Sequence, residues 1–136
     1  MPITSGLNHV AFLTTDMNRT VAFYEQAFDA VVVHEIEKSD NHPWMKIVDI
    51  GGGAMLNIFD ATAEEIIGNR RQQGGRGAVD HFAFNVSSVE VLHEVKPRLE
   101  AAGAQEVGDV QRLGGEWSLF FRDIDGLELE VCCAAD

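Results

Sequence analysis

The alternation of apolar and polar residues repeats in the two halves of the chain. Residues 7–17 (LNHVAFLTTDM) and 79–89 (VDHFAFNVSSV) share a histidine, an alanine and a phenylalanine at matching positions. In each copy, a segment containing β-branched and aromatic residues runs into a helix-start signal, which is typical of a strand followed by a helix. The repeat therefore predicts two related modules in one chain.

Capping residues mark where the two helices begin. Asp16 is the expected N-cap of the first helix, because apolar residues then follow at helical spacing. Ser87 and Glu90 form a predicted capping box for the second helix, and Gly103 is its expected end. The apolar positions are Met17, Val21, Tyr24 and Phe28 in the first helix and Leu92, Val95, Leu99 and Ala102 in the second.

Three strand-like segments follow each helix, so each half reads as one strand, one helix and three strands. The segments are 31–37, 44–50, 54–59, 105–112, 117–122 and 127–132. This pattern predicts an α+β fold of two βαβββ modules, at 5–60 and 78–133, joined by a polar, glycine-rich linker at 61–77. Because each half buries too little surface to be stable alone, we expect a single domain.

Strand alternation places four polar side chains on the sheet face that points away from the helices. In the last strand the apolar set faces the helix, so Glu130 points to the opposite side. The same argument places His81 and Asn57 on the open face, and the repeat assigns His9 to the same side as His81. The apolar set of the last strand is Leu127, Leu129 and Val131.

Two neutral imidazoles and one carboxylate on one surface suit a divalent metal ion. This donor set leaves coordination positions open for substrate and water, as a catalytic metal site requires. We therefore take His9, His81 and Glu130 as candidate metal ligands, and Asn57 as a residue that contacts the substrate or the metal. The competing interpretation is that the two open faces pack together and carry polar residues only at their rim.

The same residues resemble a known family. Segments 7–12, 16–28, 79–84 and 121–131 are similar to the vicinal oxygen chelate superfamily, also called the glyoxalase, bleomycin-resistance and extradiol-dioxygenase family. The resemblance covers nearly the whole chain. It implies two βαβββ modules that form an incomplete barrel around a metal cleft, commonly in a homodimer. It also implies metal ligands at the positions of His9, Asn57, His81 and Glu130.

The resemblance limits the reactions that we expect the protein to catalyse. Glyoxalase-I-like members carry a glutamate at the position of Asn57, and an asparagine cannot replace that base at neutral pH. The leading hypothesis is a divalent-metal-dependent enzyme that acts on a small, metal-chelating oxygenated substrate. It would be of the lyase, isomerase or epimerase, or dioxygenase type. Its metal would be Fe, Mn, Ni, Co or Zn.

Two alternatives remain at this stage. A metal-free protein of the bleomycin-resistance type would sequester an aromatic or antibiotic-like ligand. Such a pocket could be lined by Trp44, Phe59, Trp117 and Phe120, although we expect at least half of these to be ordinary core residues. A purely structural subunit would bind neither a metal nor a ligand.

Charge and cysteine content limit the partners. The 136 residues carry a formal net charge of −12, which opposes binding to nucleic acid or to an anionic membrane surface. The longest apolar run falls far short of the about 20 residues that span a bilayer. The only cysteines, Cys132 and Cys133, are adjacent on a predicted strand and point to opposite faces, so they should not form a bridge. We therefore expect a reduced, cytoplasmic protein. Its expected partners are a small-molecule substrate and, as the resemblance implies, a second copy of the chain.

Overall fold

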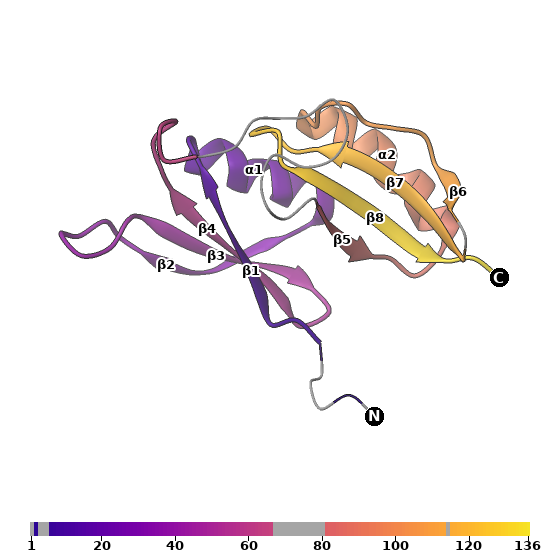
Figure 1. The fold of residues 1–136 in the computed structure, drawn as a ribbon, viewed down its shortest axis with the longest axis horizontal. Coiled ribbons are helices and arrows are strands. Elements are labelled where there is room, and N and C mark those ends of the chain that lie inside the picture. The colour runs from indigo at the N-terminus through magenta and orange to yellow at the C-terminus, as the bar shows by residue number, and fades with distance from the viewer. Residues whose placement is uncertain (1, 3–5, 67–80, 114) are drawn as a thin grey trace. The chain divides into compact units, whose positions relative to one another are not determined.

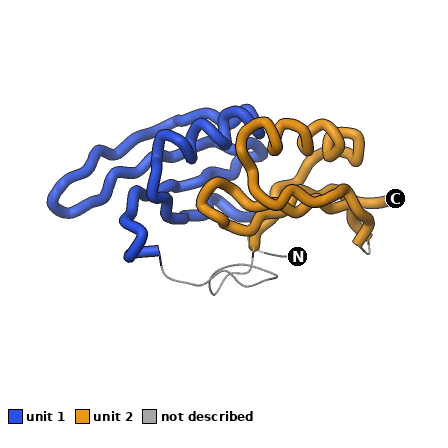
Figure 2. The backbone as a smooth tube through the Cα atoms, turned by 90° about the horizontal axis from the view of Figure 1, so that it is seen from above, with its two compact units in different colours: residues 1–66 blue, residues 67–136 orange. Residues whose placement is uncertain are grey.

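The chain forms two compact units of the same construction. The computed structural model describes residues 2, 6–66, 81–113 and 115–136. The units are Met1–Ile66 and Ile67–Asp136 (Figure 2). The first runs β1 His9–Thr14, α1 Met17–Phe28, β2 Val31–Ile36, β3 Met45–Gly51 and β4 Ala54–Asp60 (Figure 1). The second runs β5 Phe82–Asn85, α2 Val89–Ala102, β6 Gln111–Leu113, β7 Glu116–Arg122 and β8 Glu128–Ala134.

Each unit has a four-stranded sheet with the same topology. The orders are β1-β4-β3-β2 and β5-β8-β7-β6. In both sheets the first and last strands of the unit are parallel, and the other pairs are antiparallel. The predicted α+β fold of two βαβββ modules is therefore confirmed. The cleft between the modules stays a prediction, and most of the predicted linker at 61–77 lies outside the described residues.

The core of the first unit lies between α1 and one face of its sheet. The aromatic side chains of Phe23 and Tyr24 are buried, and the Tyr24 ring lies 5.9 Å from that of Phe12 on β1. The sheet residues of this core are Val48, Leu56 and Ile58, all fully buried. Because Leu56 and Ile58 alternate with Asn57, the amide side chain of Asn57 is directed to the other face of the sheet.

The second unit repeats this arrangement with α2. Figure 1 shows α2 lying along β7 and β8. The buried helix residues are Leu92, Val95 and Leu99, and the fully buried sheet residues are Leu119, Phe121, Leu129 and Val131. The odd-numbered positions of β7 and β8 thus form the core, and the even-numbered positions face away from α2.

The helix boundaries confirm most of the expected caps. The side chain of Asp16 accepts a hydrogen bond from the backbone N–H of Arg19 (3.1 Å), and Gly103 ends α2 with a positive φ of 96°. The predicted capping box of Ser87 and Glu90 is wrong, because Val91 and not Glu90 lies three residues after the observed N-cap. Ser88, not Ser87, is the N-cap of α2, and its hydroxyl accepts from the Val91 N–H at 3.4 Å. Either of the two adjacent serines could cap the helix, and the structure begins the helix at Val89.

The predicted strand at 105–112 is much shorter in the structure. Gln105 forms only an isolated bridge to Arg122, and β6 is limited to Gln111–Leu113. Glu106 has a positive φ of 51°, which breaks the extended backbone between these two points. Gly108 then donates its N–H to the carbonyl oxygen of Phe120 (2.9 Å).

Neither described helix could cross a bilayer. α1 has 12 residues and α2 has 14, and no described helix is both long and apolar enough to span a membrane.

Candidate metal centre

The open face of the second sheet carries the polar residues that the alternation predicts. Glu130 on β8 lies opposite Ala83 of β5 and Phe120 of β7. Two residues further along β8, Cys132 lies opposite Ser118. All these side chains are on the face away from α2, because the neighbouring residues of β7 and β8 form the core. The predicted orientation of Glu130 is therefore confirmed.

Glu130 is a buried carboxylate whose two oxygens have different partners. Its exposed fraction is 8%. The hydroxyl of Ser118, itself 1% exposed, donates to Oε1 at 2.6 Å. Nε2 of His81 lies 3.2 Å from Oε2. A buried charge is unfavourable unless such partners compensate it, so this carboxylate is held in place by specific contacts.

His81 lies where β5 begins, with its ring at the side of Glu130. The ring packs edge-on against Phe120, with centroids 5.4 Å apart and an interplanar angle of 74°. About a third of the side chain is exposed. Two ligand atoms that each lie about 2.1 Å from one ion, with a ligand–ion–ligand angle of about 100°, would be roughly 3.2 Å apart. The 3.2 Å between His81 Nε2 and Glu130 Oε2 is the length of a hydrogen bond, and it also matches the spacing of two neighbouring ligands of one metal ion.

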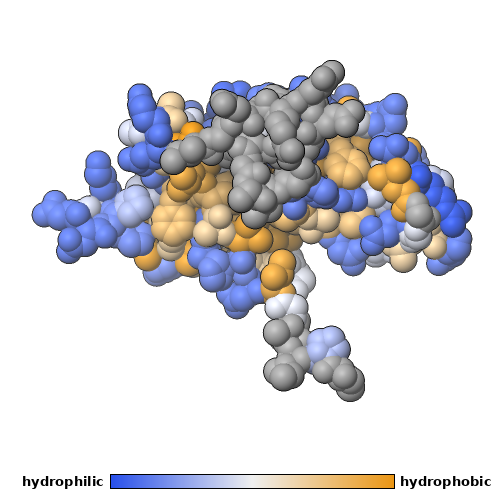
Figure 3. Space-filling view, viewed as in Figure 1, coloured by the Kyte–Doolittle hydropathy of each residue, from blue (hydrophilic) through white to orange (hydrophobic). Residues whose placement is uncertain are grey.

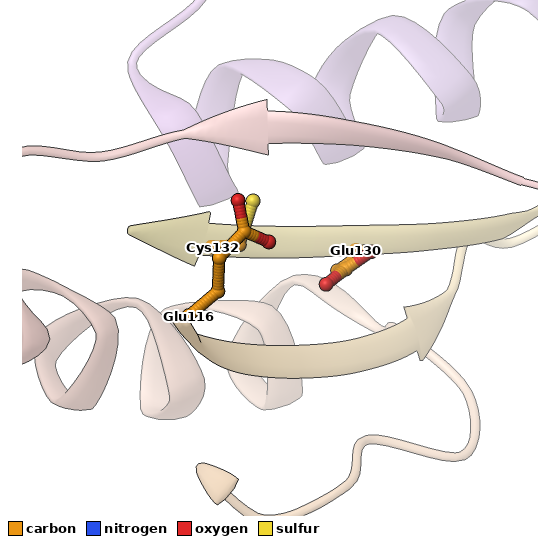
Figure 4. A group of neighbouring side chains, drawn as sticks. All are labelled: Glu116, Glu130 and Cys132. Carbon is orange, nitrogen blue, oxygen red and sulfur yellow. The ribbon is translucent and has the colours of Figure 1, made fainter. Parts of the chain in front are cut away.

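A second group of donor atoms shares Glu130. Ligand atoms of Glu116, Glu130 and Cys132 lie within 4.8 Å of one another (Figure 4). Burial raises the pKa of the Cys132 thiol to about 11, and the negative charges of Glu116 and Glu130 add to this shift. Cys132 is consequently a neutral thiol near pH 7, which is a poor metal ligand until it loses its proton.

In the first unit, His9 and Asn57 share the face that points away from α1. His9 pairs with Met55, and Ala11 pairs with Asn57, so residues 9, 11, 55 and 57 are on one side. The exposed His9 ring has Nδ1 at 2.8 Å from Oδ1 of Asn8. A proton on Nδ1 would satisfy this contact and leave Nε2 as the free electron-pair donor.

Asn57 carries a buried acceptor that is not satisfied. Among the described residues, its Oδ1 has no hydrogen-bond partner, although this atom is buried. A buried acceptor without a partner costs about 1–3 kcal/mol, so such an atom suggests a ligand or a water molecule at this position.

The sequence did not single out Ser118 and Glu116. Both alternate with the core residues of β7, as Glu130 does on β8, and that alternation was the available signal. Their proximity to Glu130, however, depends on the register of β7 against β8, which alternation alone does not define.

The comparison with known proteins decides the family. The profile of the Glyoxalase/Bleomycin resistance protein/Dioxygenase superfamily matches residues 6–131. The chain belongs to this superfamily. Metallothiol transferase FosB of Bacillus licheniformis is 28% identical over 127 residues, which are 93% of this chain and 73% of that protein.

Solved structures of the superfamily share the fold. The fosfomycin resistance protein FosX of Listeria monocytogenes has a TM-score of 0.70 and 27% identity, covering 98% of this chain and 94% of that chain. A mutant of the same FosX was solved with Mn(II) and 1S,2S-dihydroxypropylphosphonic acid; its TM-score is 0.69 and its identity 23%, with 98% and 95% coverage. A glyoxylase/bleomycin resistance protein/dioxygenase domain from Frankia sp. EAN1pec has a TM-score of 0.78 at 24% identity, with 98% and 94% coverage.

The aromatic residues do not support the metal-free alternative within this superfamily. Trp117 pairs with Cys133, whereas Phe120 pairs with Glu130, so they occupy opposite faces of β7 and cannot line one pocket. The indole N–H of Trp44 donates to Glu35 at 2.6 Å, which gives this side chain a structural partner at the surface. Trp117 and Phe120 therefore do not line one pocket together.

Proposed function

We propose that this member of the superfamily is a divalent-metal-dependent enzyme that acts on a small, metal-chelating oxygenated substrate. The observation that carries the proposal is the 3.2 Å separation between His81 Nε2 and Oε2 of the buried Glu130. The two side chains come from different strands, and they present the nitrogen and oxygen donors that Mn, Fe, Co, Ni and Zn accept. Glu130 and His81 would be two ligands of the ion.

His9 would be the third ligand. It occupies the position in the first unit that His81 occupies in the second, and its contact with Asn8 favours a free Nε2. Asn57 occupies the position that corresponds to Glu130, and its buried Oδ1 supports a contact with the substrate or with metal-bound water. An amide oxygen carries no charge, so Asn57 would orient a ligand and would not accept a proton.

The ion, when bound, would act as a Lewis acid that stabilises negative charge on a substrate oxygen. Two protein imidazoles and one carboxylate leave coordination positions for two vicinal oxygens of the substrate. The FosX complex with Mn(II) and a dihydroxylated phosphonic acid supports a substrate of this oxygen-rich kind. The reaction would be of the lyase, isomerase or epimerase, or dioxygenase type, and the name of FosB, a metallothiol transferase, adds thiol transfer as a relevant assay.

We also propose a cytoplasmic homodimer. Exposed apolar residues lie on the outer strands β2 and β6, where Val31, Val33 and Leu113 are 58%, 52% and 47% exposed. Figure 3 shows hydrophobic residues at the surface beside hydrophilic ones. Light scattering after size exclusion tests the dimer, and a monomeric mass at micromolar concentration would contradict it.

Metal analysis tests the proposed site. The purified protein is offered Mn, Fe, Co, Ni and Zn separately, and bound metal is measured for the wild type, His81→Ala and Glu130→Ala. We expect bound metal in the wild type and a large loss in both variants. Glu116→Ala and Cys132→Ser are the matched controls, because they remove only the competing donor group around Glu130.

Each result has a defined meaning. Negligible metal in the wild type with all five ions would overturn the proposal. If Glu116→Ala and Cys132→Ser lose the metal and His81→Ala keeps it, the ion is bound by Glu116, Glu130 and Cys132 instead. Retention in the two controls and loss in His81→Ala and Glu130→Ala would support the site as proposed.

A further inference from the structure

We propose that Ser118 is a positioning residue, which fixes the Glu130 carboxylate so that Oε2 is presented beside His81. This inference rests on the proposed metal site. The hydroxyl of Ser118 donates to Oε1 at 2.6 Å, a distance typical of a charge-assisted O–H···O⁻ hydrogen bond. It thereby distinguishes two carboxylate oxygens that are chemically equivalent in isolation.

The position of Ser118 favours this role over simple packing. It lies within β7 and is 1% exposed, yet it is on the face away from α2, so it is not part of the apolar core. Burying a hydroxyl is unfavourable unless it forms a hydrogen bond. The partner of this hydroxyl is the carboxylate of Glu130, and the backbone groups of β7 already pair with β8.

The surroundings explain why Glu130 needs a fixed orientation. Glu116 and Cys132 have donor atoms within 4.8 Å of a Glu130 oxygen, on the same sheet face. Without the Ser118 bond, the carboxylate would be free to rotate about its last torsion, which has a broad energy profile. Both oxygens could then turn to the ion, or one could turn toward Cys132. The bond from Ser118 holds Oε1 and leaves Oε2 next to His81.

The affinity for Mn(II) tests the role of Ser118. Titration calorimetry compares the wild type with Ser118→Ala, Ser118→Cys and Ser118→Thr. Loss of an outer-shell hydrogen bond typically weakens metal binding roughly 10–100-fold, so we expect this loss in Ser118→Ala. Ser118→Cys, with a weak S–H donor of similar shape, should also weaken binding, and Ser118→Thr should restore most of the affinity because it keeps the hydroxyl. Ser87→Ala, at an exposed serine of the same unit, is the matched control.

Two further readouts separate positioning from folding. Circular dichroism and the thermal midpoint of the metal-free proteins show which variants are folded. The visible spectrum of the Co(II) form should change in Ser118→Ala or Ser118→Cys, because release of Oε1 alters the number of oxygens around the ion. A merely structural serine would change the midpoint without changing this spectrum.

The failure of this inference differs from the failure of the proposed function. Wild-type affinity and an unchanged Co(II) spectrum in folded Ser118→Ala would overturn the role of Ser118 alone. If Ser118→Ala does not fold, the same result in Ser118→Cys has the same meaning. A wild-type protein that binds no metal would overturn the proposed function, and the role of Ser118 with it.

Discussion

Glu130 is a charged side chain at a position where charge is unfavourable. It is buried, one oxygen accepts a short hydrogen bond from Ser118, and the other faces a partly exposed imidazole. The hydroxyl and the imidazole are polar partners of this buried carboxylate, and the proposed divalent cation would compensate its charge more strongly. At the scale of the residue, the proposed metal-bound state would therefore compensate the charge of Glu130 better than the metal-free state.

The substitution Glu130→Gln separates these two states. The side chain keeps its size and an oxygen that accepts from Ser118, but it loses the buried charge. We expect the metal-free variant to be at least as stable as the wild type in urea denaturation, because a buried charge has been removed. Bound metal, measured by atomic emission, should fall to background. A variant that is clearly less stable than the wild type, or that still binds metal, would contradict this argument.

The turn between β7 and β8 shows how the elements position the site. Arg122, 3% exposed, ends β7 and binds three groups around the turn. Its Nε lies 2.9 Å from Oε2 of Glu106, and its Nη2 lies 2.9 Å from Oε2 of Glu128. Its Nη1 donates to the carbonyl oxygen of Gly126 at 3.2 Å. These contacts join the ends of both strands, and they support the register that brings Ser118 to Glu130.

The substitution Arg122→Met tests this support. It removes the buried Arg122 partner of Glu128, and breaking such a pair typically costs about 3–5 kcal/mol. We expect the free energy of unfolding to fall by about 3 kcal/mol, because the other partner, Glu106, is mostly exposed and adds little. Chemical denaturation gives the free energy of unfolding.

The control for Arg122→Met is Lys96→Ala, which removes the surface ion pair with Asp109. That pair raises the pKa of Lys96 and lowers the pKa of Asp109, but solvent screens it, so stability should hardly change. Equal stability in both variants would contradict a supporting role for Arg122.

The sequence predicted the elements better than the contacts between them. Asp16 and Gly103 were correct because a cap depends on local backbone chemistry. The predicted strand at 105–112 was wrong because the positive φ of Glu106 interrupts it. Glutamate rarely adopts a positive φ, so the sequence gives no signal for this interruption. The orientation of Glu130 followed from alternation, whereas the contact with Ser118 required the β7–β8 register.

At the scale of the whole molecule, the proposed ligands come from both units. His9 belongs to the first unit, and His81 and Glu130 belong to the second. Each unit has its own core on one side of its sheet. The stability of metal-saturated variants therefore distinguishes a ligand set that includes His9 from one that is limited to the second unit.

Metal removal tests this ligand set. A ligand that binds only the folded state stabilises it by about 2.7 kcal/mol at 100 times its dissociation constant. Wild-type protein saturated with Mn(II) should therefore unfold at a higher temperature than the same protein in EDTA, as measured by calorimetry. His81→Ala, which removes a ligand of the second unit, and His9→Ala, which removes one of the first, should each lose most of this shift. A shift that persists in His9→Ala but disappears in His81→Ala would restrict the ion to the second unit. In that case His9 would not be a ligand, and the stabilisation would be confined to the second unit.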